Sequence, residues 1–291
     1  MAIVAFALLT AWIVGHVWPR TSFLITVGLS VIAGPSLLAS PAASGSSITG
    51  KQTMHAAIFS AFDEHGVRMA RVPVPDHSSK QLLVEVKAAG LNPSNYKLSL
   101  ARIPFVRHLN GGQHVVGYDV AGIALSVGSD KSCDGLRVND AVYGFAAGAF
   151  AEYAVLSCSA AARSPASINA SVAAGLPVAA LTSLAAWERA GIKKGDDVLV
   201  LGASGGCGIF GVSIAKVLGA RVTGLCSTKN TDFVRSLGAA TVVDYKDPAA
   251  MQALVSSPPH FDVVYDTVSS FDPVDPDYEP TMRPLLKPLG R

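Results

Sequence analysis

The sequence predicts an α/β protein in which a barrel-like β-region precedes a parallel sheet with helical crossovers. In the first half, short β-branched runs are separated by turn residues at regular intervals, which is typical of small barrels. In the second half, strand and helix patterns alternate, which indicates a parallel sheet. The third feature is an apolar N-terminal segment: Arg20 is the only charged side chain in residues 1–50. We therefore expect an apolar leader over 1–50, a β-domain over 54–170 and an α/β domain over 171–291.

The composition excludes several classes of protein. Hydrophobic residues make up 50% of the chain and charged residues 15%, the opposite of a disordered polypeptide. The net charge of +2 gives no field that would attract nucleic acid, so no nucleic-acid partner is expected. The cysteines are spaced neither as a zinc ribbon nor as a disulfide framework. They are Cys133, Cys158, Cys207 and Cys226.

The leader contains two apolar runs, residues 2–18 and 23–39. Each is close to the shortest length that spans a bilayer as a helix. Three interpretations stay open: a membrane anchor, a signal or targeting segment, and an upstream extension before a natural start at Met54. The absence of a positive n-region counts against a secretory signal. Residues 2–39 would give membrane association if the leader is part of the mature protein, and otherwise we expect a cytoplasmic or organellar location.

The β-domain is predicted from alternating and β-branched segments. Residues 82–88 alternate in their second half, and residues 115–127 carry three glycines among β-branched side chains, as in a tightly turned sheet. Residues 138–143 and 151–156 are further short strands. An Ala- and Leu-rich segment over 171–190 predicts a helix that leads into the second domain.

The α/β domain follows as short units. Buried apolar runs of parallel-strand type alternate with apolar residues at helical spacing, and Gly219 and Gly238 end the first two helices. The expected strands are 197–202, 221–226, 241–245 and 261–268, and the expected helices are 209–218, 231–237 and 249–255.

A glycine-rich turn, Gly202-Ala203-Ser204-Gly205-Gly206-Cys207-Gly208, lies between the first of these strands and the first helix. Glycine lets the backbone approach a pyrophosphate, and a helix N-terminus supplies N–H groups and the positive end of a dipole. A turn that merely tightens packing is the alternative. Because strand, turn, helix and second strand follow in register, dinucleotide binding is favoured.

The end of the second strand indicates which dinucleotide. NAD sites usually place Asp or Glu there to bind the ribose 2′-OH. This chain instead has Ser227-Thr228-Lys229-Asn230, which combines hydroxyls with a cation. Such a site would accept a 2′-phosphate. The sequence therefore favours NADPH, unless Lys229 is a solvated surface lysine.

Several segments, in this order and spacing, resemble the medium-chain dehydrogenase/reductases, and most closely their zinc-independent quinone oxidoreductase branch, which includes zeta-crystallin. The resemblance runs from Met54 to Arg291 and implies a GroES-like β-domain followed by a Rossmann doubly wound parallel sheet, with the active site in the cleft. The segments that carry it are 86–93, 117–122, 138–144, 148–153, 176–182, the glycine-rich turn, 237–239 and 243–245.

The resemblance also implies the catalytic residues. Zinc-dependent relatives carry a Cys and a His-Glu pair where this chain has Asn92-Pro93-Ser94-Asn95 and Tyr118-Asp119, so no metal is expected. Asn92 would position cofactor and substrate. Tyr96 would donate a hydrogen bond to the developing oxyanion, although a packing aromatic is the alternative. Asn95 departs from the Asp that is common in the Asn-Pro-x-Asp-Tyr stretch.

Cofactor contacts are implied by position in the family. The glycine-rich turn would hold the pyrophosphate, Thr182 would contact the cofactor, and residues after the second and third strands would surround the 2′-phosphate. The full set is Thr182, Ala203, Ser204, Gly205, Gly206, Gly208, Ser227, Lys229 and Tyr245.

These features together predict NADPH-dependent, zinc-independent reduction of quinones or α,β-unsaturated carbonyls, with a small molecule as the partner. The alternatives are a non-catalytic NADPH-binding or structural relative and an enoyl-thioester reductase. Relatives continue past the point that corresponds to Arg291. We therefore expect an incomplete, C-terminally truncated Rossmann domain with an unpaired strand edge. A homodimer is a doubtful expectation, because the missing C-terminal segment makes the dimer contact in many relatives.

Overall fold

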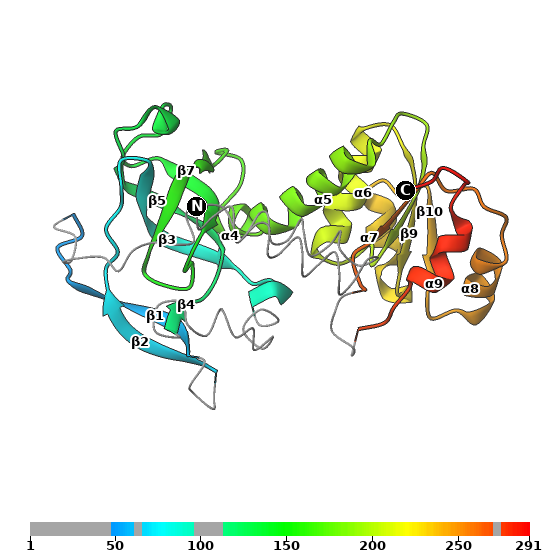
Figure 1. Ribbon diagram of the computed structural model, residues 1–291, viewed down its shortest axis with the longest axis horizontal. Helices are drawn as coiled ribbons and strands as arrows, with labels where there is room; N and C mark the ends of the chain where they lie inside the picture. Colours follow the sequence, from blue (N-terminus) through cyan, green and yellow to red (C-terminus); the bar gives the residue numbers. More distant parts are fainter. Residues whose placement is uncertain (1–47, 61–65, 96–112, 270–274) are drawn as a thin grey trace, which may run out of the picture. The chain divides into compact units, whose positions relative to one another are not determined.

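The computed structural model describes residues 48–60, 66–95, 113–269 and 275–291 (Figure 1). The described residues form two compact units that divide between Val178 and Ala179. The apolar runs at 2–18 and 23–39 lie outside them, so the three interpretations of the leader stay predictions. Within the described ranges, no helix combines the length and the apolarity that a bilayer span requires.

The first unit is built from antiparallel strands, as predicted. Strands β3, β5, β6 and β7 close into a barrel, and β2, β1 and β4 form a three-stranded sheet in that order. The sequence analysis predicted neither β1 nor β2. β2 exposes most of its residues and lacks a buried apolar face, whereas β1 buries Met54, Ala56 and Ile58 in alternation, a signal that was visible in the sequence. The bounds are β1 (Thr53–Ser60), β2 (Val67–Pro73), β3 (Gln81–Gly90), β4 (Gln113–Val115), β5 (Asp119–Val127), β6 (Ala141–Ala146) and β7 (Tyr153–Arg163).

Close approach of its strands lets this small barrel form. A Cβ atom on Gly122 of β5 would lie 2.0 Å from the carbonyl oxygen of Glu85 on β3, so only glycine fits there. Leu82, Val84 and Leu156 are fully buried and fill the interior. Irregularities in the register of β3 bend the strand as closure requires.

A disulfide joins Cys133 to Cys158, with their Cα atoms 4.9 Å apart. The expectation that the cysteine spacing fits no disulfide was wrong for this pair. Cys133 ends a short 3-10 helix, η3 (Lys131–Cys133), whose loop folds back onto β7. Sequence spacing cannot show such a contact, because 25 residues and a complete strand separate the two cysteines.

The helix predicted over 171–190 is two helices, α4 (Ala170–Ala174) and α5 (Pro177–Ala190). Pro177 cannot donate the hydrogen bond that a continuous helix needs, and it disfavours helical geometry at the preceding residue. The break therefore falls at Gly175. Asn169 begins α4 by accepting a hydrogen bond from the N–H of Val172 at 2.9 Å.

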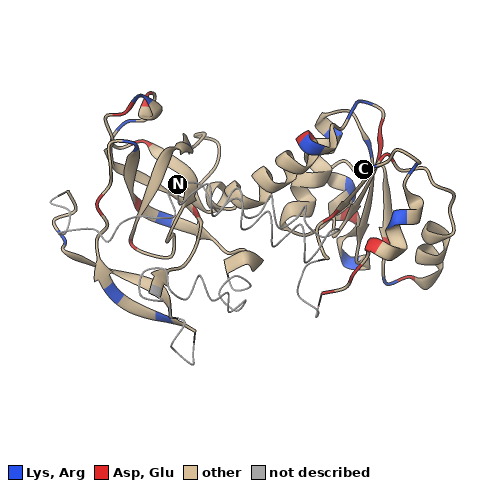
Figure 2. Cartoon of the chain, viewed as in Figure 1, with Lys and Arg blue, Asp and Glu red and all other residues tan. Residues whose placement is uncertain are grey.

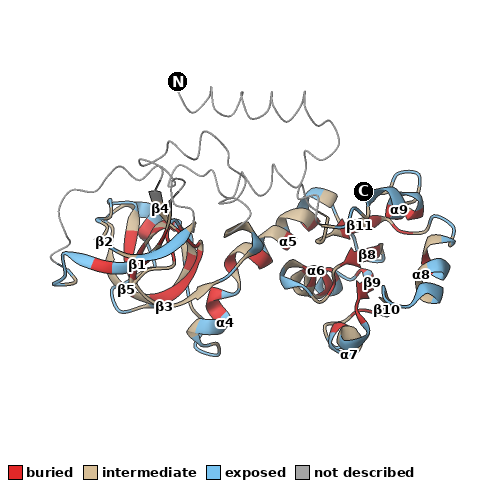
Figure 3. Ribbon diagram, turned by 90° about the horizontal axis from the view of Figure 1, so that it is seen from below, coloured by how far each residue is buried: buried red, intermediate tan, exposed pale blue. Residues whose placement is uncertain are grey.

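The second unit contains a four-stranded parallel sheet in the order β10-β9-β8-β11, which confirms the predicted Rossmann-type arrangement. Its central strands are buried, as the red colouring in Figure 3 shows. Trp187 of α5 anchors the helices by packing on Tyr265 and donating to the carbonyl of Gly211. The bounds are β8 (Asp197–Leu201), α6 (Gly206–Val217), β9 (Arg221–Cys226), α7 (Thr231–Ser236), β10 (Thr241–Asp244), α8 (Pro248–Val255), β11 (Val263–Asp266) and α9 (Glu279–Met282).

Residues 285–291 lie along the outer edge of β11. The N–H of Val264 donates to the carbonyl of Arg291, and the N–H of Arg291 donates to the carbonyl of Asp262, both at 2.9 Å. The edge that we expected to be unpaired is therefore covered in part by the chain itself. Acidic and basic residues are interspersed along the chain in both units (Figure 2).

Candidate functional site

The glycine-rich turn connects the carboxyl end of β8 to α6, which begins at Gly206, earlier than the sequence predicted. Gly205 is the N-cap and has no side chain that could cap the helix. The first N–H groups of a helix have no acceptor within it, and the positive end of the helix dipole lies at the same place. The start of α6 is therefore suited to bind an anion such as a pyrophosphate.

Gly208 could not be replaced without moving this turn. A Cβ atom at this position would lie 2.1 Å from the carbonyl oxygen of Gly202 and 2.8 Å from the Cα atom of Ala203. Both contacts are to backbone, which cannot rotate away. Gly208, the last glycine of the turn, thus sets how closely the helix packs against the strand that precedes it.

A cluster of polar side chains lies where β9 ends. The Nδ2 atom of Asn230 donates to the Oγ atom of Ser204 at 2.9 Å and lies 3.4 Å from the Oγ atom of Ser227. An amide nitrogen can only donate, so both serine oxygens act as acceptors toward it. Their hydroxyl protons then remain to be donated to another group. We call Ser204, Ser227 and Asn230 the hydroxyl–amide cluster.

Two more predicted residues lie on the same edge of the sheet. Lys229 belongs to a 3-10 turn, η4 (Thr228–Asn230), and pairs with no acidic side chain among the residues described. Tyr245 follows β10 and is 46% exposed. Asp244 at the end of β10 accepts hydrogen bonds from the Thr228 hydroxyl and from the N–H of Lys246, which lower its pKa. This carboxylate is therefore already engaged by donors of the chain.

Helix α5 reaches the turn from the other side. Thr182 is half-buried on this helix, and its neighbour Ser183 is completely buried. The Ser183 hydroxyl donates to the carbonyl of Cys207 at 2.8 Å and lies 3.2 Å from the hydroxyl of Tyr265. Burial raises the pKa of Tyr265, so this phenol stays protonated. The network fixes the first turn of α6 against α5 and β11.

Of the two predicted catalytic residues, the structure describes Asn92, whereas Tyr96 lies outside the described residues. Asn92 is half-buried and lines an open hollow of about 550 Å³ together with Val116 and Phe150. Its backbone N–H donates to the Oδ1 atom of Asn95 at 2.7 Å. An asparagine oxygen accepts this bond as an aspartate oxygen would, so the departure from the family pattern keeps this contact.

Asp119 is a polar residue at this site, which the sequence analysis named only as standing, with Tyr118, where zinc-dependent relatives carry a His-Glu pair. It is 1% exposed, and its Oδ2 atom accepts a hydrogen bond from the Nδ2 atom of Asn92 at 2.9 Å. Burial raises the pKa of Asp119 to about 6, although hydrogen bonds from Asn92 and Val178 oppose the rise. The available signal was an aspartate at the start of an otherwise apolar strand.

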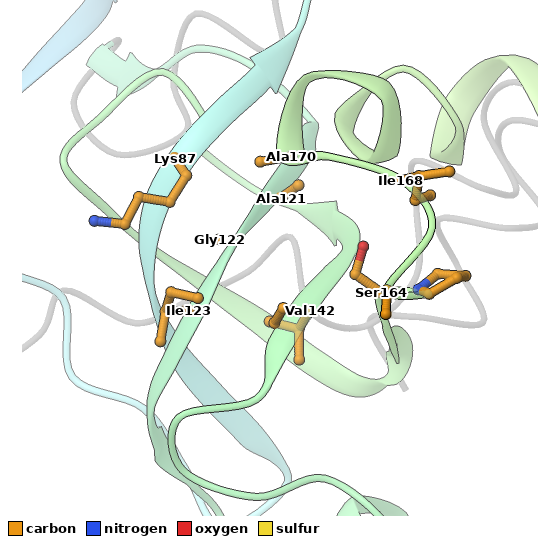
Figure 4. Close-up of a pocket in the computed structure, with 11 residues that line it drawn as sticks. Lys87, Ala121, Gly122, Ile123, Val142, Ser164, Ile168 and Ala170 are labelled. Atoms are coloured by element: carbon orange, nitrogen blue, oxygen red, sulfur yellow. The ribbon is translucent and has the colours of Figure 1, made fainter.

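A second hollow of about 260 Å³ lies on the wall of the barrel. Figure 4 shows the ammonium group of Lys87 directed away from the other labelled side chains, and this group pairs with Glu85 at 2.7 Å. The remaining lining is apolar apart from Ser164. This hollow therefore lacks the groups that would handle a hydride acceptor.

A metal centre would need several ligands close together. In the parts of the chain that are described, no three His, Cys, Asp or Glu side chains are grouped so that they could hold a metal ion. His114, near the position of the zinc ligands of relatives, is half-buried, and burial lowers its pKa. Its ring packs on Phe59 at 5.5 Å between centroids.

Two family models match the chain. The alcohol dehydrogenase GroES-like domain matches residues 78–166, and the zinc-binding dehydrogenase model matches residues 206–281. The first covers the barrel strands, and the second covers α6 and the strands β9, β10 and β11. The order of the two matches is the order that the sequence predicted.

Individual relatives agree with these matches. The chain is 36% identical to the 2-methylene-furan-3-one reductase of Solanum lycopersicum, over 68% of this chain and 52% of the relative. It is 34% identical to the chloroplast envelope quinone oxidoreductase homolog of Arabidopsis thaliana, over 72% of this chain and 67% of the relative. The chain thus spans about half of the first protein and two thirds of the second.

Solved structures show the same fold. A mycobacterial protein solved in complex with NADPH has a TM-score of 0.66 and 26% identity, covering 80% of this chain and 71% of that one. The fold, the two family models and the reductase relatives lead to one conclusion. The chain belongs to the medium-chain dehydrogenase/reductase superfamily of oxidoreductases, in its zinc-independent quinone oxidoreductase branch.

Proposed function

We propose that the chain reduces quinones or α,β-unsaturated carbonyls by hydride transfer from NADPH. The observation that carries this proposal is the hydroxyl–amide cluster beside the glycine-rich turn, with Lys229 next to it. The substrate class is supported by the relatives, one named as a quinone oxidoreductase homolog and one as the reductase of a conjugated ketone.

The residues present fit a dinucleotide that carries a 2′-phosphate. The start of α6 offers N–H groups for a pyrophosphate, and the glycine at position 208 keeps the backbone close enough. Hydroxyl protons of Ser204 and Ser227 and the ammonium of Lys229 suit a ligand that is entirely an acceptor. A ribose 2′-OH would gain less from this set of donors, because no carboxylate at the end of β9 accepts its proton.

The chemistry divides between cofactor and chain. Bound NADPH supplies the hydride, and the chain supplies orientation and a proton or hydrogen bond for the substrate oxygen. We assign orientation to Asn92 and the hydrogen bond to Tyr96, following the family pattern. Reduction of a conjugated carbonyl needs one donor at the oxygen that becomes an enolate or quinol, so this assignment requires no Lewis acid.

The hollow beside Asn92 supports a planar, largely apolar substrate. Val116 and Phe150 give it apolar walls, and Asn92 and Asn95 bring amide groups to it. A conjugated ring with one or two carbonyl oxygens matches this combination of surfaces. A charged substrate would fit this hollow less well, because no charged side chain among the described residues lines it.

Turnover with purified protein tests the proposal. NADPH consumption would be followed by absorbance with a benzoquinone, a simple enone and an enoyl thioester, and each assay would be repeated with NADH. We expect consumption of NADPH with the quinone or the enone, in stoichiometric proportion to the reduced product. NADPH binding without turnover on any of the three would favour the non-catalytic alternative. Turnover on the thioester alone would replace the substrate class that we propose.

A further inference from the structure

Asp119 is a carboxylate buried without a cationic partner. Its side chain is 1% exposed, and no lysine, arginine or histidine among the described residues pairs with it. Space for it exists because Gly90 has no side chain: a Cβ atom there would lie 2.9 Å from the Cβ atom of Asp119 and 2.5 Å from the carbonyl of Ala174. Burying an unpaired carboxylate disfavours folding, so its presence at this place calls for a role.

Both hydrogen-bond partners of Asp119 are donors. The Oδ1 atom accepts from the backbone N–H of Val178 and the Oδ2 atom from the Nδ2 atom of Asn92, each at 2.9 Å. The N–H of Val178 is fixed in the first turn of α5. An ionised carboxylate has no proton to donate, whereas the amide of Asn92 could present either its nitrogen or its oxygen. Asp119 therefore determines which end of the Asn92 amide turns inward.

The outward end of that amide is its oxygen. Asn92 lines the hollow of about 550 Å³, and among the described residues its Oδ1 atom accepts no hydrogen bond. The backbone of Asn92 is held separately by Asn95, so the amide cannot easily shift as a whole. The site thus offers an acceptor to any N–H or O–H donor that enters the hollow.

We propose that Asp119 is a positioning residue that holds the amide of Asn92 so that its oxygen, rather than its nitrogen, faces a ligand with a hydrogen-bond donor, such as a carboxamide N–H. This inference rests on the proposed function, because it concerns how the same reductase site orients its cofactor or substrate. Asp119 acts through Asn92 and does not touch the reacting atoms.

Asp119→Asn is the informative substitution. The new amide has one acceptor and one donor, and the N–H of Val178 takes the acceptor. Its nitrogen then faces Asn92, whose amide must turn over and present nitrogen to the hollow. We expect kcat/KM to fall roughly tenfold to a hundredfold, while the melting temperature changes little. Asp134→Asn, which neutralises an exposed carboxylate of the same unit, is the matched control.

The exchanged pair Asn92→Asp with Asp119→Asn tests the orientation itself. The amide introduced at position 119 would accept from Val178 and donate to the carboxylate introduced at position 92, whose second oxygen would again face the hollow. We expect this double variant to recover most of the activity that Asp119→Asn loses. If the wild-type enzyme is active and the folded Asp119→Asn variant has the same kcat/KM, the inference is overturned and the proposed function stays intact.

A readout that is independent of turnover separates the two proposals. Burial, not a neighbouring charge, sets the pKa of Asp119 at about 6, because β3, β6 and the first turn of α5 bring Gly90, Phe145 and Val178 against it. Protonation would remove one of its acceptors. We therefore expect the side-chain amide resonance of Asn92 to shift as the pH crosses about 6. A resonance that does not move would refute the inference even if no substrate is reduced.

Discussion

The two edges of the parallel sheet use polar groups in opposite ways. At the amino edge, Arg221 places two nitrogen atoms 2.7 Å from the oxygens of Asp197, and Lys287 lies 2.6 Å from Asp262. At the carboxyl edge, hydroxyl, amide and backbone N–H groups surround the glycine-rich turn. There Lys229 forms no ion pair with a described residue. The charges at the amino edge pair with one another, whereas the carboxyl edge has donors that our proposal assigns to a ligand.

The parallel direction of the strands produces this division. Every strand begins at one edge and ends at the other, so residues that start strands meet each other, and residues that follow strands also meet. In open α/β sheets, ligands bind outside the carboxyl ends. The comparison therefore indicates that substitutions at the amino edge change stability alone, whereas substitutions at the carboxyl edge change ligand binding.

Gly208→Val should have the largest effect. Its added atoms would meet the carbonyl oxygen of Gly202, since even a Cβ atom would lie at 2.1 Å, and the turn would have to move. We expect the dissociation constant for NADPH to rise roughly 100-fold or more, measured by fluorescence titration. Gly175→Ala is the control, because a Cβ atom there finds its nearest neighbour at 3.4 Å. Unchanged NADPH binding by a folded Gly208→Val variant would break the comparison.

Lys229→Ala should have a smaller and more selective effect. Loss of one charge-assisted contact to a 2′-phosphate should weaken NADPH binding by roughly tenfold and leave NADH binding unchanged. Lys193→Ala removes the same charge from the loop before β8, on the amino side of the sheet, and should alter neither affinity. If both variants weaken both cofactors equally, Lys229 contributes only to the general charge of the chain.

Asp197→Asn tests the amino edge. It breaks the two-nitrogen contact with Arg221 and removes the negative charge that lies 3.7 Å from the ammonium of Lys287, the ion-pair partner of Asp262. We expect a melting temperature lower by a few degrees, because networks of ion pairs contribute more than isolated pairs. The affinity for NADPH should not change. Asp232→Asn, whose carboxylate is 99% exposed beside Arg235, should leave both quantities near the wild-type values.

Lowering the pH should produce the smallest change, a loss of thermal stability through the Lys287–Asp262 pair at the amino edge. The hydrogen bond from Lys287 holds the pKa of Asp262 below its ordinary value of 3.8. The stabilisation by this pair is therefore complete above that value and is lost as the pH falls through the lower pKa of the folded state. Thermal unfolding at decreasing pH should show a shallower decline for Asp262→Asn than for wild type. Parallel declines would show that the pair adds nothing measurable.

The sequence predicted the α/β unit almost element by element, because its buried strands are continuous apolar runs and Gly219 and Gly238 mark the ends of its first two helices after the glycine-rich turn. In the β-unit, periodicity was less informative. β2 exposes Met69 by 66% and Val67 by 51%, so no buried face marks it as a strand. The sequence predicted one helix over 171–190 where the structure has two, although Pro177 was visible as a signal for the break.

Long-range contacts account for what the sequence could not show. The pairing of Cys133 with Cys158 depends on a loop folding onto β7. The burial of Asp119 depends on Gly90 and Val178, which lie on other elements. Asn230 was visible as the end of a hydroxyl-rich run, but its bond to Ser204 joins two separate turns. The residue types in the sequence indicated that the carboxyl edge of the sheet carries polar groups. Their hydrogen-bond partners became visible only in the folded structure.

The central claim is that the carboxyl edge binds a dinucleotide through its 2′-phosphate. The most direct measurement is a pair of fluorescence titrations of the wild-type chain, one with NADPH and one with NADH. We predict that NADPH binds at least roughly tenfold more tightly, and that free 2′,5′-ADP competes with it while 5′-ADP competes poorly. Equal affinities, or tighter binding of NADH, would contradict the claim.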